Sequence, residues 1–244
     1  MSKKHGELRM SIAGFMGRDP AVFLRSADTD DQIDLLTTAC NNARLFAERQ
    51  IDFEASKVSV KLLAVSLTEG ANLEDAVLSS DGVTPVRVKK IRTPFLPFGE
   101  GFYPVDLIGK KTWDHRIKGK FEQTRPTDPV SPILASEIPF CVIQDGNLVY
   151  AAPADRTAFP SEPFTIALDV IQWLDDYEDV DQSDFLLDFA FDWLMYRAIY
   201  ELNFFLKEDE RVMISTKLIN DAWDAIVKWN SELVAASVDD VDLD

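Results

Sequence analysis

Residues 184–233 read DFLLDFAFDWLMYRAIYELNFFLKEDERVMISTKLINDAWDAIVKWNSEL, and this stretch decides the fold. Between Phe185 and Leu206, apolar side chains occupy almost every face of a helix, and a helix that is apolar on all sides must be covered on all sides. Ser183 and Asp184 supply an N-cap hydroxyl and a carboxylate at the positive end of the helix dipole. We therefore expect a buried helix to begin at this point.

A transmembrane assignment for the same segment is disfavoured by its charges. About 20 apolar residues suffice to cross a bilayer, so the length alone would permit it. However, each charged side chain at the centre of a bilayer costs at least about 2.5 kcal/mol. The segment contains Asp188, Asp192, Arg197 and Glu201. Burial against other helices or against a neighbouring subunit is the better explanation.

A second helix is expected after the polar turn at residues 207–210. Asp209 can cap this helix, and apolar residues recur at spacings of three and four as far as Leu233, which is typical of an amphipathic helix. The short connection predicts that the two helices form an antiparallel hairpin. A long amphipathic helix from Asp28 to Phe53 is expected to pack against this hairpin.

The middle of the chain favours strands. Residues 58–67 and 164–170 alternate between apolar and other side chains with a period near two. The dipeptide Asp145-Gly146 lies between two apolar runs and predicts a hairpin, because Asp-Gly suits a primed turn that needs a positive φ. We expect the strand at 164–170 to join this hairpin in a small antiparallel sheet.

Together these patterns predict an α+β fold, in which a helical bundle carries a β-rich antiparallel insertion. The bundle would consist of the long N-terminal helix and the C-terminal helical hairpin. Residues 94–132 contain six prolines and four glycines, so a long loop is expected within the insertion. The expected ranges are an N-terminal arm at 1–27, the bundle at 28–55 and 183–234, the insertion at 56–174, an acidic linker at 175–182 and an acidic tail at 235–244.

The charge of the chain is strongly negative. Its 244 residues carry a net charge of −17, which opposes nonspecific binding to nucleic acid and favours a basic protein partner. The segment from Arg87 to Arg125 reverses this balance, with ten Lys or Arg against four acids. These basic residues are candidates for contact with DNA phosphates in a channel or with the acidic surface of a neighbouring subunit. The candidates are Arg87, Lys89, Lys90, Arg92, Lys110, Lys111, Arg116, Lys118 and Lys120.

No catalytic, cofactor-binding or metal-binding site is predicted. The acidic cluster at 175–184 lacks the alternate spacing and the glycine of a calcium loop, so a solvated linker is favoured over a metal site. His115 follows Asp114, but neighbours in a strand point to opposite faces, which disfavours a catalytic pair. Cys40 and Cys141 have no metal-ligand spacing, and we expect buried free thiols at both positions.

The order of segments up to residue 233 resembles a known family. A β-rich segment is followed by an acidic linker, an apolar helix containing a Tyr, the turn Phe205-Leu206-Lys207-Glu208-Asp209-Glu210-Arg211 and a helix with spaced Trp residues. This order resembles the head-to-tail adaptor (connector) proteins of tailed bacteriophages, and the resemblance covers residues 138–233 best. It implies a structural virion protein without enzymatic activity. Copies would form a ring, usually of twelve, that docks under the portal, extends the DNA channel, helps to retain packaged DNA and provides the attachment surface for the tail.

The resemblance also implies partners and a location. The partners are the portal protein, a tail or nozzle protein, further copies of the chain, and double-stranded DNA that passes through the channel without sequence-specific binding. No membrane is involved, and the location is the neck of the virion after assembly in the host cytoplasm. In this family a C-terminal extension often docks onto the portal, and the acidic tail of this chain is the candidate for that role. The alternative is that the tail is a solvated, frayed end. The docking candidates are Val238, Asp239, Asp240, Val241, Asp242, Leu243 and Asp244.

Two other functions stay open at this point. The first is another neck or tail protein of the same particles, such as a stopper or a tail terminator. The second is an acidic enzyme that uses the carboxylates at 175–184 with a divalent metal. Direct binding to the portal would distinguish the adaptor from another neck or tail protein. Stoichiometric Mg, Mn or Zn in the purified protein would favour the enzyme.

Overall fold

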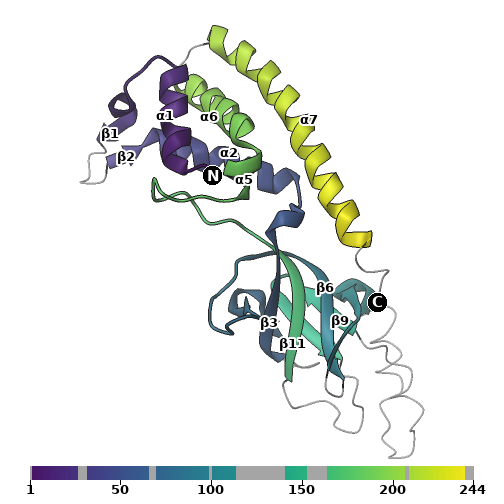
Figure 1. Ribbon diagram of the computed structural model, residues 1–244. Helices are drawn as coiled ribbons and strands as arrows, with labels where there is room; N and C mark the ends of the chain where they lie inside the picture. The colour runs from purple at the N-terminus through teal and green to yellow at the C-terminus, as the bar shows by residue number, and fades with distance from the viewer. Residues whose placement is uncertain are drawn as a thin grey trace, which may run out of the picture. The chain divides into compact units, whose positions relative to one another are not determined.

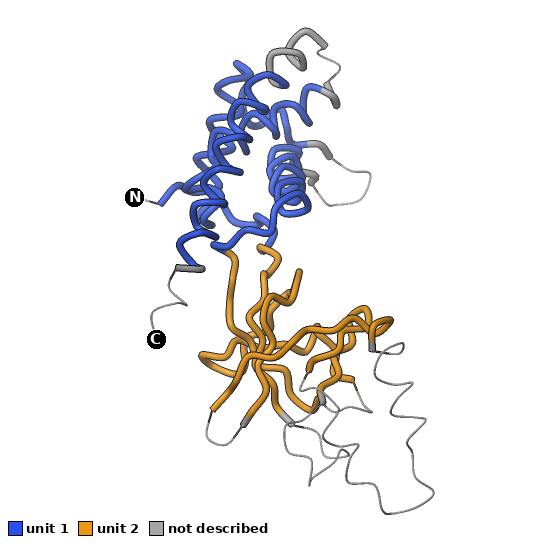
Figure 2. Tube along the Cα trace, turned by 90° about the vertical axis from the view of Figure 1, so that its right-hand side faces the viewer, with its two compact units in different colours: residues 1–55, 175–244 blue, residues 56–174 orange. Residues whose placement is uncertain are grey.

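The chain divides into two compact units. The computed structural model describes residues 2–26, 32–65, 70–98, 101–113, 141–152, 164–206 and 209–239. Unit 1 comprises residues 1–55 and 175–244, and unit 2 comprises residues 56–174 (Figure 2). Unit 1 is therefore built from both ends of the chain, and unit 2 lies between them in the sequence.

Unit 1 is mainly helical, and helix α6 lies at its centre. Its elements are α1 (His5–Phe15), the 3-10 helix η1 (Pro20–Phe23), a ribbon of β1 (Leu24–Ser26) and β2 (Gln32–Asp34), α2 (Leu35–Gln50), α5 (Phe185–Phe189), α6 (Phe191–Leu206) and α7 (Asp209–Asp239) (Figure 1). α6 packs against α1, α2 and α7. Its buried side chains include Trp193, Leu194 and Leu202. Contact on several sides is what its apolar sequence requires.

Aspartate caps set the starts of two of these helices. The Asp34 carboxylate accepts hydrogen bonds from the amides of Leu36, at 3.0 Å, and Thr37, at 3.3 Å. The Asp184 carboxylate accepts one from the amide of Leu187 at 2.8 Å. The predicted helix start is therefore confirmed, but the N-cap is the Asp184 carboxylate and not the Ser183 hydroxyl that was expected. The predicted helix start near Asp28 is wrong, because strand β2 precedes α2 and the helix begins only at Leu35.

The predicted single helix over residues 185–206 is interrupted. α5 ends at Phe189, Ala190 has φ −121° outside the helical range, and α6 begins at Phe191. At the break, the ring of Phe189 stacks on that of Trp229 in α7, with centroids 4.7 Å apart. α7 continues to Asp239, beyond the predicted end near residue 234.

Unit 2 contains two sheets and one shared core. Its elements are β3 (Lys57–Val65), β4 (Ala71–Asn72), the 3-10 helix η3 (Leu73–Asp75), β5 (Val77–Leu78), β6 (Val88–Phe98), β7 (Gly101–Pro104), β8 (Asp106–Gly109), α3 (Lys110–Trp113), β9 (Cys141–Asp145), β10 (Leu148–Ala152) and β11 (Phe164–Gln172), with η2 (Glu54–Ser56) at the boundary between the units. The strand orders are β5-β3-β11-β6-β7 and β4-β10-β9-β8. Apolar side chains from both sheets, among them Leu62, Leu168 and Val149, form a single buried cluster.

The predicted fold class is wrong. The structure is mixed α/β, with a five-stranded and a four-stranded sheet, and the described residues do not form the expected bundle of one long N-terminal helix and a helical hairpin. The N-terminal region instead contains two helices of 11 and 16 residues with a β-ribbon between them. The middle region is not purely antiparallel either, because β8 pairs with β9 in parallel.

The predicted hairpin is confirmed, but its predicted neighbour is not. β9 and β10 pair antiparallel, and Asp145 lies opposite Leu148, so Gly146 and Asn147 form the turn. Gly146 has φ +62°, a conformation that favours glycine. β11 does not join this hairpin. It lies in the other sheet, between β3 and β6.

The predicted loop is wrong over residues 94–113, where β6, β7, β8 and α3 lie, and residues 114–132 lie outside the described part of the chain. Proline lacks an amide proton, so it is usually excluded from central strands. Here the pairing of β6 with β11 shifts register between Ile91 and Thr93 and ends at Phe95. Pro94 is therefore paired with Leu168 just after the irregularity, whereas Pro97 lies beyond the end of this ladder.

Candidate interaction surfaces

The predicted basic contact residues fall at two places in unit 2. Arg116, Lys118 and Lys120 lie outside the described residues. The others are Arg87, Lys89, Lys90 and Arg92, in or just before β6, and Lys110 and Lys111, in α3. Arg87, Lys90, Arg92 and Lys111 are exposed. The structure therefore places part of the predicted set on β6 or next to its start, and we call Arg87, Lys90 and Arg92 the β6 basic row.

Two of the remaining predicted residues have local roles. The Lys89 ammonium lies 5.3 Å from the ring centroid of Trp173. The Lys110 ammonium forms an ion pair with Asp145 at 2.7 Å and lies 5.9 Å from the ring centroid of Tyr150. These contacts stay within unit 2, so they support the local structure of the strands.

Sequence reasoning missed two lysines that extend the basic surface. Lys57 and Lys90 both lie opposite Ile171 of β11, and Lys61 lies opposite Ala167, so all three occupy the same face of the five-stranded sheet. Lys57 also approaches Asp169 at 3.9 Å. The alternation of Lys57, Ser59 and Lys61 along β3 was a usable signal, because residues two apart share a face.

The predicted portal-docking tail lies mostly outside the described residues. Val238 and Asp239 are the last two residues of α7. Asp240, Val241, Asp242, Leu243 and Asp244 are not described. Docking of the tail onto the portal therefore stays a prediction.

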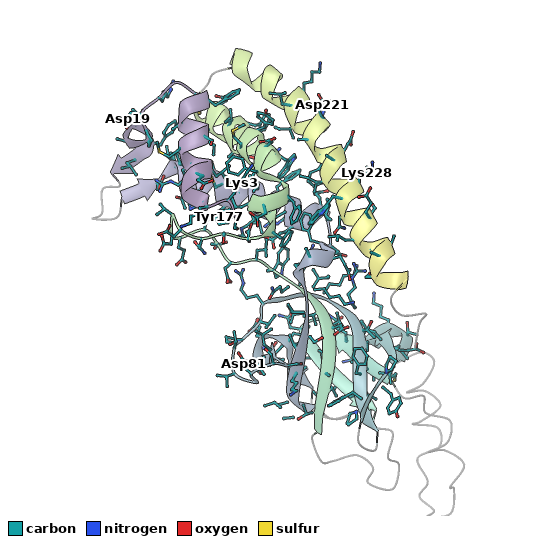
Figure 3. All side chains as sticks on the ribbon, in the orientation of Figure 1. Lys3, Asp19, Asp81, Tyr177, Asp221 and Lys228 are labelled. Atoms are coloured by element: carbon teal, nitrogen blue, oxygen red, sulfur yellow. The ribbon has the colours of Figure 1, made fainter. Side chains whose placement is uncertain are left out.

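The acidic segment 175–184 is attached to unit 1 by side-chain hydrogen bonds. Tyr177, labelled in Figure 3, is 2% exposed, and its backbone amide donates to the Asn41 side chain at 2.7 Å. The Asn41 amide donates in return to the Tyr177 carbonyl at 3.1 Å. The Gln182 side chain accepts from the amides of Glu178 and Asp179. The expected solvated linker is therefore a folded segment, and several of its backbone groups are paired.

A buried ion pair lies beneath this segment. Arg44 in α2 is 2% exposed, and its guanidinium donates to the Glu48 carboxylate at 2.6 Å. It also contacts the carboxylate of Asp176, whose side chain is 59% exposed. A buried Arg–Glu pair satisfies both charges, whereas removal of one partner leaves the other charged and desolvated. Within this cluster, the contact between Arg44 and Asp176 links α2 to the start of the acidic segment.

Burial also shifts the titration of the groups around Tyr177. The Tyr177 hydroxyl donates to Asp184 at 2.9 Å, and burial raises the pKa of Tyr177 well above its ordinary value. Burial raises the pKa of Asp184 too, although the hydrogen bond from the Leu187 amide acts in the opposite direction. His5 stacks on Tyr177 with centroids 4.9 Å apart, and burial lowers the pKa of His5. Desolvation thus favours the neutral form of all three groups.

His5 should make unit 1 less stable in mild acid. Because the folded pKa of His5 lies below its unfolded value near 6.5, its contribution to stability is complete above about pH 6.5 and is lost as the pH falls through the folded pKa. Asp184 opposes this trend, since its raised pKa favours the folded state as the carboxyl becomes protonated. A comparison with His5→Phe, which leaves Asp184 in place, isolates the histidine.

The measurement is urea unfolding of the wild type and the His5→Phe variant at pH 8 and pH 5.5. The wild type should lose more free energy of unfolding than the variant on acidification, by at most about 1.4 kcal/mol. The phenyl ring keeps the stacking on Tyr177 but cannot be protonated. Equal losses in the two proteins would show that His5 does not titrate differently in the folded and unfolded states.

Two further observations concern the metal-ligating and thiol side chains of the described residues. The described residues contain no group of three or more His, Cys, Asp or Glu side chains that could hold a metal ion. Cys40 and Cys141 are buried free thiols, as predicted, and burial raises the pKa of each to about 12. A thiol with so high a pKa is a poor nucleophile near neutral pH.

A groove of about 380 Å³ opens in unit 1 between the α5–α6 junction and α7. Seven of its ten lining residues are apolar, and the other three are Lys3, Asp188 and Asp192. The lining residues are Lys3, Asp188, Phe189, Ala190, Phe191, Asp192, Trp193, Ala222, Ala225 and Ile226. We call this cavity the α5–α7 groove.

Aromatic contacts and one amide hold α7 at the far wall of this groove. Between residues 216 and 237, Ile226 is the one buried residue of α7. Trp223 packs against Trp193 at 5.1 Å between centroids. The Asn230 side chain accepts from the Glu54 amide at 2.9 Å and donates to the Asp52 carbonyl at 3.2 Å. Asp221 and Lys228 point away from the other helices of unit 1 (Figure 3).

Comparisons with known proteins add no assignment. No protein-family model matches the chain, and no curated protein matches it either. In the described part of the chain, no helix combines the length and the apolar character needed to span a bilayer. A functional assignment therefore rests on the residues and surfaces described above.

Proposed function

We propose that this chain is a structural virion subunit, the head-to-tail adaptor of a tailed bacteriophage. Copies assemble into a ring, of twelve by the resemblance, under the portal protein and present a surface to the tail or nozzle protein. The proposal is supported by the sequence resemblance over residues 138–233 and by the division of charge between the two units. It requires no catalytic group, cofactor or metal.

The division of charge is the observation that carries the proposal. Unit 1 contains 12 Lys and Arg against 28 Asp and Glu, a net charge of −16, whereas unit 2 contains 13 against 14, a net charge of −1. Within unit 2, the β6 basic row, Lys57 and Lys61 place positive charge on strands of the five-stranded sheet. One chain thus presents both an acidic and a basic surface.

A ring needs two different surfaces of this kind. Each subunit of a ring repeats one heterologous contact, so the surface that it offers to one neighbour must complement the surface that it offers to the other. Opposite charges on the two surfaces fix the register of that contact and speed the encounter. We therefore assign the basic residues of unit 2 to contact with a neighbouring subunit in preference to DNA.

The acidic surplus also suits a DNA channel. Duplex DNA carries a dense row of phosphates, and a channel wall with negative charge repels them and lets the duplex slide without adhering. In this proposal DNA passes through the ring without sequence-specific contacts. The acids of unit 1 are the candidates for the channel wall.

The test is the mass of the purified chain, alone and mixed with purified portal protein, measured by native mass spectrometry. We expect a complex of portal with a ring of copies of this chain. A chain that never binds portal would overturn the adaptor assignment. Truncation after Asp239 leaves α7 intact, and portal binding at wild-type affinity by this variant would remove the role proposed for residues 240–244.

A further inference from the structure

The α5–α7 groove has the chemistry of a cation-binding site. Phe189 and Phe191 line it with ring surfaces, and the Phe189 side chain is 63% exposed although its ring stacks on Trp229. Asp188 and Asp192, both exposed, add two carboxylates to the lining. Aromatic faces and carboxylates together attract the ammonium of Lys or the guanidinium of Arg.

One cation of the chain already occupies part of this groove. The Lys3 ammonium lies 4.1 Å from the ring centroid of Phe191. The backbone amide of Lys3 donates to the Asp188 carboxylate at 2.8 Å, and the Ser2 hydroxyl donates to the same carboxylate at 3.1 Å. Lys3 is exposed, and Figure 3 shows it beside the helices of unit 1. The groove therefore accepts a lysine side chain without burying it.

We infer that the α5–α7 groove receives a Lys or Arg side chain from the β6 basic row of a second copy of this chain, and that Lys3 competes for the same place. This inference rests on the proposed ring. The β6 basic row is exposed and belongs to the unit that is nearly neutral overall, whereas the groove belongs to the unit with a net charge of −16. Complementary charge is thus the reason to choose a second copy as the occupant.

Because Lys3 already occupies the groove, a loss of its charge should affect self-association in the opposite direction to a loss of a groove carboxylate. An exposed cation–π contact contributes about 0.5–1 kcal/mol, which corresponds to a factor of about two to five in an equilibrium constant. A second copy that inserts its own cation must displace Lys3 and lose that contact. Removal of the Lys3 charge should therefore strengthen self-association, whereas removal of a groove carboxylate should weaken it.

The experiment is sedimentation velocity of the full chain at low salt, over concentrations up to about 1 mM, with four variants. Asp192→Asn should weaken self-association at least about fivefold, because it removes one of the groove carboxylates. Lys90→Gln with Arg92→Gln should weaken it by a similar or larger factor. Lys3→Met should strengthen it about two- to fivefold. Glu178→Gln, an exposed acid outside the groove lining, is the matched control and should change it less than about twofold.

Three results would each overturn the inference. They are a wild type that is monomeric at every concentration, an Asp192→Asn variant that behaves like the Glu178→Gln control, and a Lys3→Met variant that associates no better than the wild type. None of them decides the adaptor assignment, because portal binding is measured separately. A chain that binds portal in a ring but gives one of these results keeps the proposed function and loses this contact.

Discussion

Replacing Arg44 by Met should lower the free energy of unfolding of unit 1 by about 3–5 kcal/mol. The side chain is 2% exposed and pairs with Glu48, which is equally buried. Without the guanidinium, the Glu48 carboxylate stays desolvated and loses its counter-charge. Asp176, whose side chain is 59% exposed, returns to water at little cost. Denaturant unfolding followed by the fluorescence of Trp193, Trp223 and Trp229 in unit 1 measures the loss.

The double variant Arg44→Met/Glu48→Met is the control that separates charge from packing. When both partners of a buried pair are replaced by apolar side chains of similar volume, the change is often neutral or stabilising. We expect the double variant to unfold within about 1 kcal/mol of the wild type. A double variant as unstable as Arg44→Met alone would show that lost packing, and not the loss of the Arg44–Glu48 charge pair, causes the effect.

Leu168→Ala should destabilise unit 2 by about 2–5 kcal/mol. Leu168 is fully buried in β11, the central strand of the five-stranded sheet, and belongs to the apolar cluster shared by both sheets. Truncation to Ala removes three side-chain carbons and leaves a cavity that the flanking strands β3 and β6 can close only in part. Hydrogen exchange of the β3 and β11 amides should accelerate accordingly.

Leu63→Ala is the matched control for this prediction. Leu63 lies in β3 of the same sheet, but its side chain is 56% exposed, so the same truncation should change stability by no more than about 0.5 kcal/mol. Because the two units have separate cores, the amides of α2 and α6 should exchange at wild-type rates in Leu168→Ala. Faster exchange in α2 and α6 would show that the two units unfold together.

Local signals in the sequence predicted local features correctly. The helix start at Asp184 and Phe185 depends on one capping side chain and the next three residues, although the cap is Asp184 and not the expected Ser183, and the β9–β10 turn depends on Gly146 and its neighbours. In both cases the decisive interaction lies within a few residues of the signal. The apolar character of residues 191–206 likewise predicted a covered helix, because it reflects burial directly.

Features that depend on distant partners were predicted poorly. The partner of β11 was wrong, because alternation shows that a strand exists but not which strand it joins. The prolines of β6 suggested a loop, since their positions relative to the β11 register were not visible in the sequence. The break between α5 and α6 coincides with stacking of Phe189 on Trp229, 40 positions along the chain.

The α5–α7 groove could not be predicted from the sequence for the same reason. Its lining comes from three segments, at Lys3, at 188–193 and at 222–226, and no pattern in the sequence brings them together. The basic residues were found, because like charges cluster within one segment. Their acidic counterpart was expected only in general, on the surface of a neighbouring subunit, and the groove carboxylates Asp188 and Asp192 in α5 and α6 were not singled out for it.

The insertion of unit 2 within unit 1 has a consequence for biosynthesis. A ribosome makes α1 and α2 first, then the whole of residues 56–174, and α6 only near the end. Unit 2 can therefore fold during translation, whereas Leu8, Ile12 and Leu36, which are fully buried in the finished protein, wait for the last quarter of the chain. Until then, the nascent chain displays these apolar side chains to chaperones and to other nascent chains.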